Sequence, residues 1–480
     1  MKTSFIKLIV LLFSLGLYAQ TGHIMQGVGS VNMSMGGAAT AQPLDISGAM
    51  HWNPAAISVF DDKILKLDVG FFFSSPELSS SLPEGLLYPE GAFGPGSPAS
   101  PAVYGTTKDD RGVSYMPALG MVWGNENSKH TFGVSAFGIS GFGVTFPQET
   151  NLPMDMNGNP NMDWNPNNSN AINWPQGLNG FGRIESDYML LQVSATYAYE
   201  LTDKISIGIQ PNFNYAALEL NPNPIASPDF PPSMGGTGKG YPKADSTPAI
   251  GFGAQFGVFY DSGSGLKLGA SYKTNQTFGE FEFDNEYLDG TDAPDVKFQM
   301  DYPAIMSLGL GYSFTNFDFA LDFRRVFYEN TEGFEASGWA IGDNGFPTGA
   351  VQGFGWKDIS ILSVGLQYKG ISKLPLRLGY TYSGNPIDED LAFFSTPATA
   401  IIKNAYQFGL SYEINDNWRL DAVYHYGDSN GATEGRILDP RQITPNNPLG
   451  EIPGTSVSYK MTTSMAMFGI NYTFKKKTKD

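Results

Sequence analysis

From residue 63 to the end of the chain, hydrophobic and polar side chains alternate along most of the sequence. In residues 63–73, Leu65, Leu67 and Val69 fall on one face, whereas Lys66 and Asp68 fall on the other. This alternation predicts a β-strand with one apolar and one polar face. About 14 segments share the pattern, an even number like that of single-chain bacterial barrels. They are residues 63–73, 113–123, 131–146, 187–200, 204–218, 249–261, 265–283, 296–314, 317–328, 357–369, 374–383, 404–414, 417–427 and 460–474.

The connections between these segments alternate between short and long. The short ones are residues 124–129, 201–203, 262–264, 315–316, 370–373 and 415–416, and the others are several times longer. A transmembrane barrel has this order, with tight periplasmic turns and long extracellular loops, whereas a soluble sandwich has no reason for it. Most segments also reach the roughly 9–11 residues that cross a bilayer when tilted. The predicted fold is all-β, a transmembrane antiparallel β-barrel of about 14 strands in the outer membrane of a Gram-negative cell.

Residues 27–58 do not follow the alternation. This stretch is rich in Gly, Ala and Ser, and Gly36, Gly37, Pro43, Gly48 and Pro54 interrupt it. Such a sequence suits neither a core strand nor a long helix. Because it precedes a first strand that must rise from the periplasmic side, we expect it to fold into the lumen as a plug, or hatch.

The first residues have the pattern of a secretory signal peptide. Lys2 and Lys7 form a basic region, residues 8–17 are apolar, and Ala19 ends a possible cleavage site. The alternative is an uncleaved anchor, but the apolar run is shorter than the roughly 20 residues of a spanning helix. The predicted organisation is a signal peptide at 1–19, a hatch at 20–62, the barrel at 63–474 and a basic tail at 475–480.

Composition and charge narrow the function. The chain has 57 glycines, 14% aromatic residues and 16% charged residues, a profile that suits a sheet with one apolar face but also a soluble sandwich. A formal charge of −18 argues against a nucleic-acid partner. Without cysteine, neither a disulfide scaffold nor a cysteine-based site is possible. The four histidines are scattered, and no metal-ligand spacing or catalytic arrangement is seen. We therefore expect no enzyme activity, no metal and no cofactor.

Several motifs resemble the FadL/OmpP1/TodX family of outer-membrane transport proteins. They are the opening GVGSVNMSMGGAAT (residues 27–40), Asp45, the WNPAA motif (52–56), LRLGYTY (376–382) and NWRLDAVYHY (417–426). A looser similarity joins Tyr302-Pro303 to the segment 322–324. The similarity of architecture extends over nearly all of the chain after the signal peptide, and the hatch motif is its most specific part.

The resemblance implies a channel for passive uptake of hydrophobic molecules, either fatty acids or aromatic hydrocarbons. It implies a monomer that sits in outer-membrane lipid and holds its ligand in a pocket beside the hatch. Asp45, Trp52, Asn53, Pro54 and Ala55 are the hatch residues it assigns to gating, although simple plug packing would need the same residues.

In the family, a kink in the third strand opens the barrel wall sideways. Here that strand is residues 131–146. Its apolar phase is even up to Ala136, odd at Phe137 and Ile139, and even again from Phe142. A slip of phase in a glycine-rich strand indicates a bulge or kink, although a merely twisted strand is the alternative. The candidate residues for a lateral opening are Gly133, Phe137, Gly138, Gly141 and Gly143.

Two further expectations concern ligand contacts. A fatty-acid carboxylate needs a cation in an apolar pocket, and Arg377 or Arg419 could supply it. The loop 147–186, with Trp164, Trp174 and Phe181, is a candidate capture surface or simply a solvated loop. Two other functions remain open on the same barrel. One is a shuttle-like role in type IX protein secretion or surface attachment, and the other is a general porin.

Overall fold

The computed structural model describes residues 23–475 except 93, 155–158 and 336–337. The predicted signal peptide and residues 476–480 of the basic tail lie outside the described residues. The 14 strands of a closed antiparallel barrel match the predicted segments one to one, and β1 closes the ring by pairing with β22. These strands are β1 (Lys63–Leu82), β3 (Ser114–Trp123), β4 (His130–Phe146), β5 (Ile184–Thr202), β6 (Ile205–Asn221), β7 (Lys243–Asp261), β8 (Leu266–Lys273), β13 (Ala304–Ser313), β14 (Phe317–Phe327), β17 (Ile359–Tyr368), β18 (Leu376–Ser383), β19 (Asn404–Glu413), β20 (Trp418–Asp428) and β22 (Ser456–Phe474).

The two faces of the wall follow the sequence alternation. On β1, Leu67 and Phe71 are exposed on the outside, whereas Lys66 and Asp68 are fully buried inside. The outward apolar residues form the surface that contacts lipid, and the inward polar residues face the lumen. Among the described residues, no helix is both long enough and apolar enough to cross a membrane.

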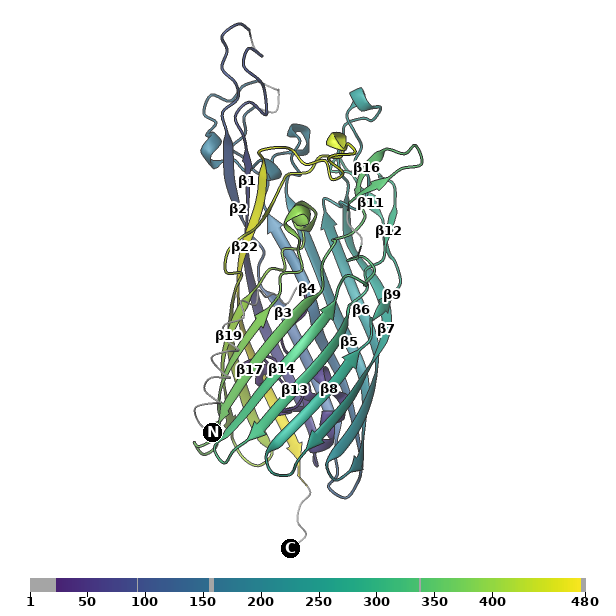
Figure 1. Cartoon of the computed structure of the whole chain (residues 1–480), viewed down its shortest axis with the longest axis vertical. Coiled ribbons are helices and arrows are strands. Elements are labelled where there is room, and N and C mark those ends of the chain that lie inside the picture. Colours follow the sequence, from purple (N-terminus) through teal and green to yellow (C-terminus); the bar gives the residue numbers. More distant parts are fainter. Residues whose placement is uncertain (1–22, 93, 155–158, 336–337, 476–480) are drawn as a thin grey trace.

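Short turns gather at one end of the barrel and long loops at the other (Figure 1). At the loop end, β1 and β22 project together with β2 (Val103–Lys108), which pairs with the upper part of β1. The predicted strands 265–283 and 296–314 are each interrupted. In the first, two short loop strands follow the barrel strand β8, and in the second, one short loop strand precedes the barrel strand β13. The remaining loop elements are β9 (Thr277–Phe278), β10 (Phe281–Phe283), β11 (Asn285–Glu286), β12 (Val296–Phe298), β15 (Trp339–Ile341), β16 (Pro347–Val351), β21 (Thr433–Gly435), and the 3₁₀ helices η2 (Pro166–Asn168), η3 (Ala171–Asn173), η4 (Gln176–Leu178), η5 (Pro232–Met234), η6 (Glu389–Ser395) and η7 (Pro440–Gln442).

The segment before β1, residues 23–62, lies inside the barrel, and we call it the hatch. It contains the helices α2 (Ser30–Ser34) and α3 (Ile46–Trp52) and the 3₁₀ helix η1 (Pro54–Val59). The Asp45 side chain caps α3 by accepting from the backbone N–H of Gly48. Asn53 caps η1 in the same way through Ala55, and Pro54 occupies the first turn, where its missing N–H costs nothing. Nearly every hatch residue from His23 to Ser58 is buried, so the hatch fills this part of the lumen.

Glycines on the lumenal face of the wall let the hatch backbone approach closely. A Cβ atom on Gly208 would lie 2.3 Å from the backbone nitrogen of Ala55, and one on Gly269 would lie 2.0 Å from the Thr40 carbonyl oxygen. Other wall glycines in comparably tight contact with the hatch are Gly257, Gly309, Gly365, Gly379 and Gly409. Part of the high glycine content therefore serves the fit between hatch and wall.

Candidate functional site

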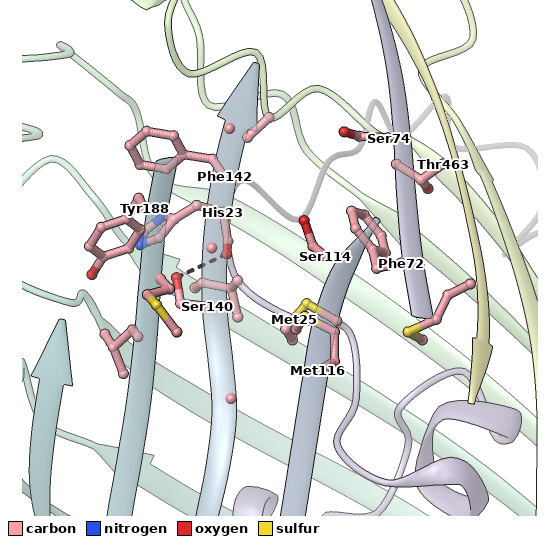
Figure 2. A pocket seen from close by; sticks show the side chains of 18 of the residues that line it. His23, Met25, Phe72, Ser74, Ser114, Met116, Ser140, Phe142, Tyr188 and Thr463 are labelled. Carbon is pink, nitrogen blue, oxygen red and sulfur yellow. Dashed lines mark hydrogen bonds between the residues drawn. The ribbon is translucent and has the colours of Figure 1, made fainter. Parts of the chain in front are cut away.

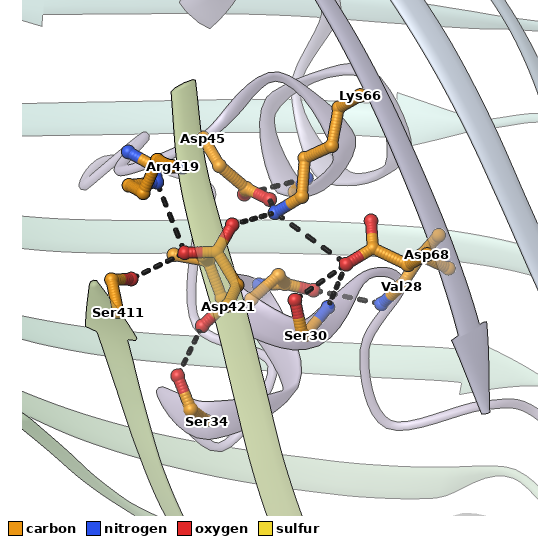
Figure 3. A network of polar contacts seen from close by, with 12 residues as sticks. Val28, Ser30, Ser34, Asp45, Lys66, Asp68, Ser411, Arg419 and Asp421 are labelled. Atoms are coloured by element: carbon orange, nitrogen blue, oxygen red, sulfur yellow. Dashed lines mark hydrogen bonds and ion pairs between the residues drawn. The ribbon is translucent and has the colours of Figure 1, made fainter. Parts of the chain in front are cut away.

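A buried network of charges joins the hatch to the wall (Figure 3). The Lys66 ammonium lies 2.5 Å from the Asp45 carboxylate, 3.5 Å from that of Asp421 and 3.8 Å from that of Asp68. Asp68 also accepts hydrogen bonds from the backbone N–H and the hydroxyl of Ser30 in the hatch. Buried charges need such partners because desolvation is otherwise costly. Asp45 is therefore both a helix cap and one half of an ion pair that anchors the hatch.

A second polar contact holds the opposite side of the hatch. Asp322 accepts from the backbone N–H groups of Ala39 and Thr40, each at 2.9 Å. Arg324 pairs with Asp322 at 2.6 Å, and its guanidinium lies 3.5 Å from the ring centroid of Trp52. Trp52 is thus covered by a cation, a geometry that stabilises both partners.

Asn53 and its neighbours connect α3 to the wall. The Asn53 amide donates to the carbonyl oxygens of Thr40 in the hatch (2.8 Å) and Val258 in β7 (3.1 Å). Ala55 is fully buried, and its backbone nitrogen faces Gly208 in β6. All five predicted hatch residues therefore lie at the interface between hatch and wall. Whether they also control gating remains a prediction.

Arg377 and Arg419 lie in the charge network. The Arg377 guanidinium donates to the side chains of Gln367 (2.7 Å) and Ser411 (2.8 Å). Arg419 pairs with Asp421 at 3.0 Å. Neither arginine lines the large cavity described next. Their proposed contact with a carboxylate remains a prediction, and both already have polar partners in the wall.

Of the two predicted changes of phase in residues 131–146, the return to even phase after Ile139 corresponds to a bulge. The change at Phe137 does not, because the odd-numbered residues stay buried from Thr131 to Ile139. The pairing of β4 with β5 shifts register between Gly138 and Ser140, so that Ile139 is the extra residue. The pairing of β4 with β3 runs only from Trp123–Phe132 to Ala118–Phe137. Above that point Ser140 of β4 forms a bridge with Ile24 of the hatch instead. The hydrogen-bond ladder of the wall is therefore interrupted between the upper parts of β3 and β4.

The interruption has a defined upper limit. The backbone N–H of Asp110 donates to the carbonyl oxygen of Thr145 at 2.8 Å, and Thr145 donates to the Asp109 carboxylate. Arg111 reaches across Gly143 toward β5, where it pairs with Asp187 at 2.8 Å. The wall is thus connected again through the segment before β3. Burial raises the pKa of Asp109, which its hydrogen bonds partly oppose.

A cavity of about 520 Å³ lies at this interruption. Figure 2 shows His23, Phe142 and Tyr188 on one side of it, Met25, Ser114 and Met116 between, and Phe72, Ser74 and Thr463 on the other. The hatch, β1, β3, β4, β5 and β22 all contribute to its lining. Its volume is in the range of small-molecule sites, and its lining is mostly apolar with a few polar groups.

Methionine is prominent around the cavity. Met25, Met33, Met116, Met189, Met461 and Met465 all line it. Unbranched thioether side chains adapt to ligands of different shape and are frequent at promiscuous apolar sites. The cavity can therefore accept an apolar molecule without a strict shape requirement.

The predicted residues of the third strand fall in different places. Gly138, Gly141 and Gly143 line the cavity. Phe137 is the last β4 residue paired with β3, and its buried ring lies 6.5 Å from that of His51. Gly133 lies lower in the wall, where it faces Met50 of the hatch, and it does not line the cavity. The role of these residues in a lateral opening remains a prediction.

Three features of this site were missing from the sequence prediction. Pro117 lies in β3 directly beside the interruption; a proline inside a strand is a signal that could have been used, because it cannot donate to a ladder. Arg111 lies in a predicted loop, and no pattern marks it. The contact of residues 23–26 with β4 is also invisible locally, because the partners are more than 100 residues apart, as Ser140 and His23 show.

In the loop after β4, one of the three named aromatic residues is buried, and the role of the loop in capture stays a prediction. Trp174 is only 3% exposed and packs with Leu82, Val103 and Ala171. Its indole N–H donates to Ser169 at 2.8 Å. Trp174 therefore attaches the loop to the projecting part of β1 and β2 and does not form an exposed apolar surface.

Within the part of the chain that the structure describes, no group of three or more acidic or histidine side chains could hold a metal ion. Both ring nitrogens of His51 are buried and have no partner among the described residues. Burial lowers the pKa of His51 well below the ordinary value, and the charges of Lys273 and Arg324 add to the effect. It is therefore a neutral packing residue beside Trp52.

A closed barrel with a hatch in its lumen and a cavity beside that hatch is the architecture of an outer-membrane transport channel. Residues 180–475 match the family described as outer membrane protein transport protein (OMPP1/FadL/TodX). The chain belongs to this family, as the sequence motifs predicted, and the outer-membrane location follows from it. This is a family of transport channels and not of enzymes.

Solved structures share the fold at low sequence identity. The P. putida toluene transporter TodX superimposes with a TM-score of 0.63 at 18% identity, covering 94% of this chain and 99% of TodX. A Pseudomonas aeruginosa FadL homologue gives 0.67 at 14% identity, with 95% and 100% covered. The Ralstonia pickettii toluene transporter TbuX gives 0.56 at 16% identity, with 93% and 99% covered. At these identities the likeness shows the fold alone. A search of curated proteins found no match.

Proposed function

We propose that this protein admits hydrophobic small molecules, either aromatic hydrocarbons or long-chain fatty acids, passively through the outer membrane as a monomer. The ligand enters from the loop end, occupies the cavity beside the hatch and leaves sideways between β3 and β4. The observation that carries the proposal is the position of the 520 Å³ cavity at the interruption of the ladder. A ligand there has apolar walls on the lumenal side and a gap in backbone pairing toward the lipid.

The bulge at Ile139 supports this exit. Because Ile139 is the extra residue between Gly138 and Ser140, it bends β4 away from a continuous ladder with β3. Removing it would let β4 continue in register toward Pro117 and Met116 and narrow the gap. Such a change acts on the wall and leaves the hatch residues in place.

The experiment is a deletion of Ile139 in the full chain. We expect uptake of toluene or oleate by cells that depend on this channel to fall by at least about tenfold, since the bend that holds the gap open is gone. The matched control deletes Leu201, the extra residue of a second bulge, between Glu200 and Thr202 at the turn end of the barrel. If both deletions leave the same amount of folded protein and the same uptake, exit between β3 and β4 is wrong.

The head group of a fatty acid can be tested separately. Arg111 is the arginine that lines the cavity, and its partner Asp187 is more than half exposed. We propose Arg111 as the first contact of a carboxylate, with Arg377 and Arg419 kept as the deeper candidates. If the carboxylate binds at Arg111, Arg111→Gln should weaken oleate uptake and leave toluene uptake unchanged. An equal loss of both would show that Arg111 only shapes the mouth.

A further inference from the structure

Six aromatic rings surround the imidazole of His23. Its ring centroid lies 5.0 Å from that of Phe334, with the two rings stacked, and 5.6–6.4 Å from the others. The others belong to Phe142, Tyr188, Tyr302, Tyr328 and Trp356. We call these six side chains the aromatic cage. Aromatic neighbours at such distances favour a flat ring between them.

The cage is built by the barrel and its loops, not by the hatch. Phe142 comes from β4 and Tyr188 from β5, whereas Phe334 and Trp356 come from the loop between β14 and β17. The cage residues are almost fully buried, and the Trp356 indole N–H is fixed by a hydrogen bond to Ser395 at 3.0 Å. The cage would therefore keep its shape if the occupant left.

The cage adjoins the large cavity. Phe142 and Tyr188 line both, His23 inside the cage also borders the cavity, and Figure 2 shows the three together at one side of it. A molecule in the cavity could therefore place a ring in the cage without crossing another barrier, provided that the imidazole moved away.

Imidazole is an imperfect occupant. Its Nδ1 contacts the Tyr328 hydroxyl at 3.0 Å, but its Nε2 is buried without a partner in the described part of the chain. Burial lowers the pKa of His23 to about 3, so the ring is neutral at ordinary pH. A buried polar atom without a partner is unfavourable. A hydrocarbon ring has no such atom, and its entry breaks one hydrogen bond, that between Nδ1 and Tyr328. The hydroxyls of Tyr188 and Tyr302 lose nothing, because they have no partner in the described part of the chain even with the imidazole in place.

Among the described residues, three hydrogen bonds join His23 and Met25 to β4. The His23 carbonyl oxygen accepts from the Gly141 N–H at 3.2 Å and the Ser140 hydroxyl at 3.0 Å, and Met25 donates to the Ile139 carbonyl oxygen at 3.1 Å. These bonds all end on the bulged part of β4. The segment that carries His23 can therefore leave β4 without breaking the pairing of β4 with β5.

We propose that the aromatic cage is a binding subsite for one planar aromatic hydrocarbon ring, and that His23 is its built-in occupant, which a ligand must displace. The inference rests on the proposed function, since the ligand reaches the cage through the cavity. It narrows the preferred ligands to those that carry an aromatic ring. Binding and departure of His23 are then coupled, because ring and imidazole cannot share the cage.

The test uses toluene labelled with ¹³C in its methyl group and the full-length protein in lipid nanodiscs. The ring currents of the cage shift the methyl proton resonance of a bound toluene, whereas toluene dissolved in lipid gives an unshifted signal. In His23→Ala the cage is vacated, and we expect the shifted signal to saturate at a toluene concentration at least about tenfold lower, because the competing occupant is gone. In His23→Phe the cage is filled permanently, and the shifted signal should disappear.

The absence of cysteine allows a second variant that keeps His23. Ile24 and Ser140 form a non-hydrogen-bonded antiparallel pair, whose Cα atoms lie about 4.5 Å apart, within reach of a disulfide. In Ile24→Cys with Ser140→Cys, the oxidised protein holds His23 in the cage and should lose the shifted signal, and reduction should restore it. His130→Ala is the matched control, because His130 is exposed and stacks on Tyr197 outside the cage.

The outcomes separate this inference from the proposed function. Methylcyclohexane, which has the size of toluene but no aromatic ring, should show no preference for His23→Ala over wild type. If wild type takes up toluene but all His23 variants and the oxidised disulfide bind it alike, the cage subsite is wrong and the channel stands. If wild type takes up no hydrophobic compound at all, the proposed function fails, whatever the cage binds.

Discussion

Lys66→Met tests whether buried charge holds the hatch in the barrel. The change keeps most of the side-chain volume and removes the charge. Lys66 is completely buried and has three carboxylates within 3.8 Å, one of them Asp45 of the hatch. Arg419 and Arg377 lie in the same network and remain in place. The variant therefore leaves one buried negative charge without compensation.

The size of the expected loss in docking free energy follows from the burial of the ion pair between Lys66 and Asp45. Removing one partner of a buried ion pair typically costs about 3–5 kcal/mol, because the other charge stays desolvated. Around Lys66, β1 pairs with β22 on one side and with β3 on the other, so we expect the cost to fall on the docking of the hatch. A cost of that size raises the population with a released hatch by roughly 10²- to 10⁴-fold.

The assay is limited proteolysis of the purified protein, with cleavage inside the hatch measured by mass spectrometry. Cleavage follows the released population when release is fast compared with cutting. Lys129→Met, in an exposed turn, is the control for loss of one lysine. The double variant Asp45→Asn with Lys66→Met should recover part of the loss, because asparagine still caps α3 and no longer carries a charge.

The refuting result is equally specific. If Lys66→Met and Lys129→Met are cleaved in the hatch at the same rate, the ion pairs do not hold the hatch. If the double variant is cleaved as fast as or faster than Lys66→Met, the cost does not come from the uncompensated charge on Asp45.

Three further predictions concern the same interface. Gly208→Ala should displace η1 and raise the rate of hatch cleavage, because the new Cβ would lie 2.3 Å from the Ala55 nitrogen. Gly112→Ala is the control, since no described atom lies within 4 Å of its Cβ position. Equal hatch cleavage in the two variants would contradict the close approach. Asn53→Ala leaves the Thr40 and Val258 carbonyl groups without their donor and should weaken docking by about 2–3 kcal/mol in the same assay; an unchanged cleavage rate would show that these bonds are not needed. His23 has a pKa of about 3 when docked and an ordinary value of 6.5 when released, so released protein binds more protons between these values. His23 should not affect the docking of the hatch above pH 6.5, and docking should weaken by up to about 1.4 kcal/mol per pH unit as the pH falls below 6.5. His23→Phe should lack this contribution to the pH dependence. Identical pH profiles for wild type and His23→Phe would refute the prediction.

Much of the fold could be predicted because barrels repeat one local rule. Alternation along each strand shows which side chains face lipid and which face the lumen, and the contrast of short and long connections shows the direction of each strand. The bulge in β4 was also visible, because an extra residue inverts the apolar phase, as it does between Ile139 and Phe142. The position of the hatch followed from its place before a rising strand.

The sequence alone could not say which residues meet across the lumen. Alternation places Lys66 and Asp68 inside the barrel. Only closure of the ring brings Asp421 of β20 close to Lys66, and only the folding of the hatch into the lumen adds Asp45. Alternation likewise places Arg377 and Arg419 on the polar face of their strands, yet their partners in the wall depend on the strand register.

What the sequence by itself determined is therefore local: the strands, their faces, the turns and the irregular third strand. The tertiary structure decided the site, because the cavity and the aromatic cage form only where closure of the sheet brings distant segments together. His23 and Tyr328 are 305 residues apart in the chain, and their contact depends on the packing of the hatch within the closed ring. No periodic pattern encodes a contact of that kind, since a period fixes the direction of a side chain but not its opposite partner.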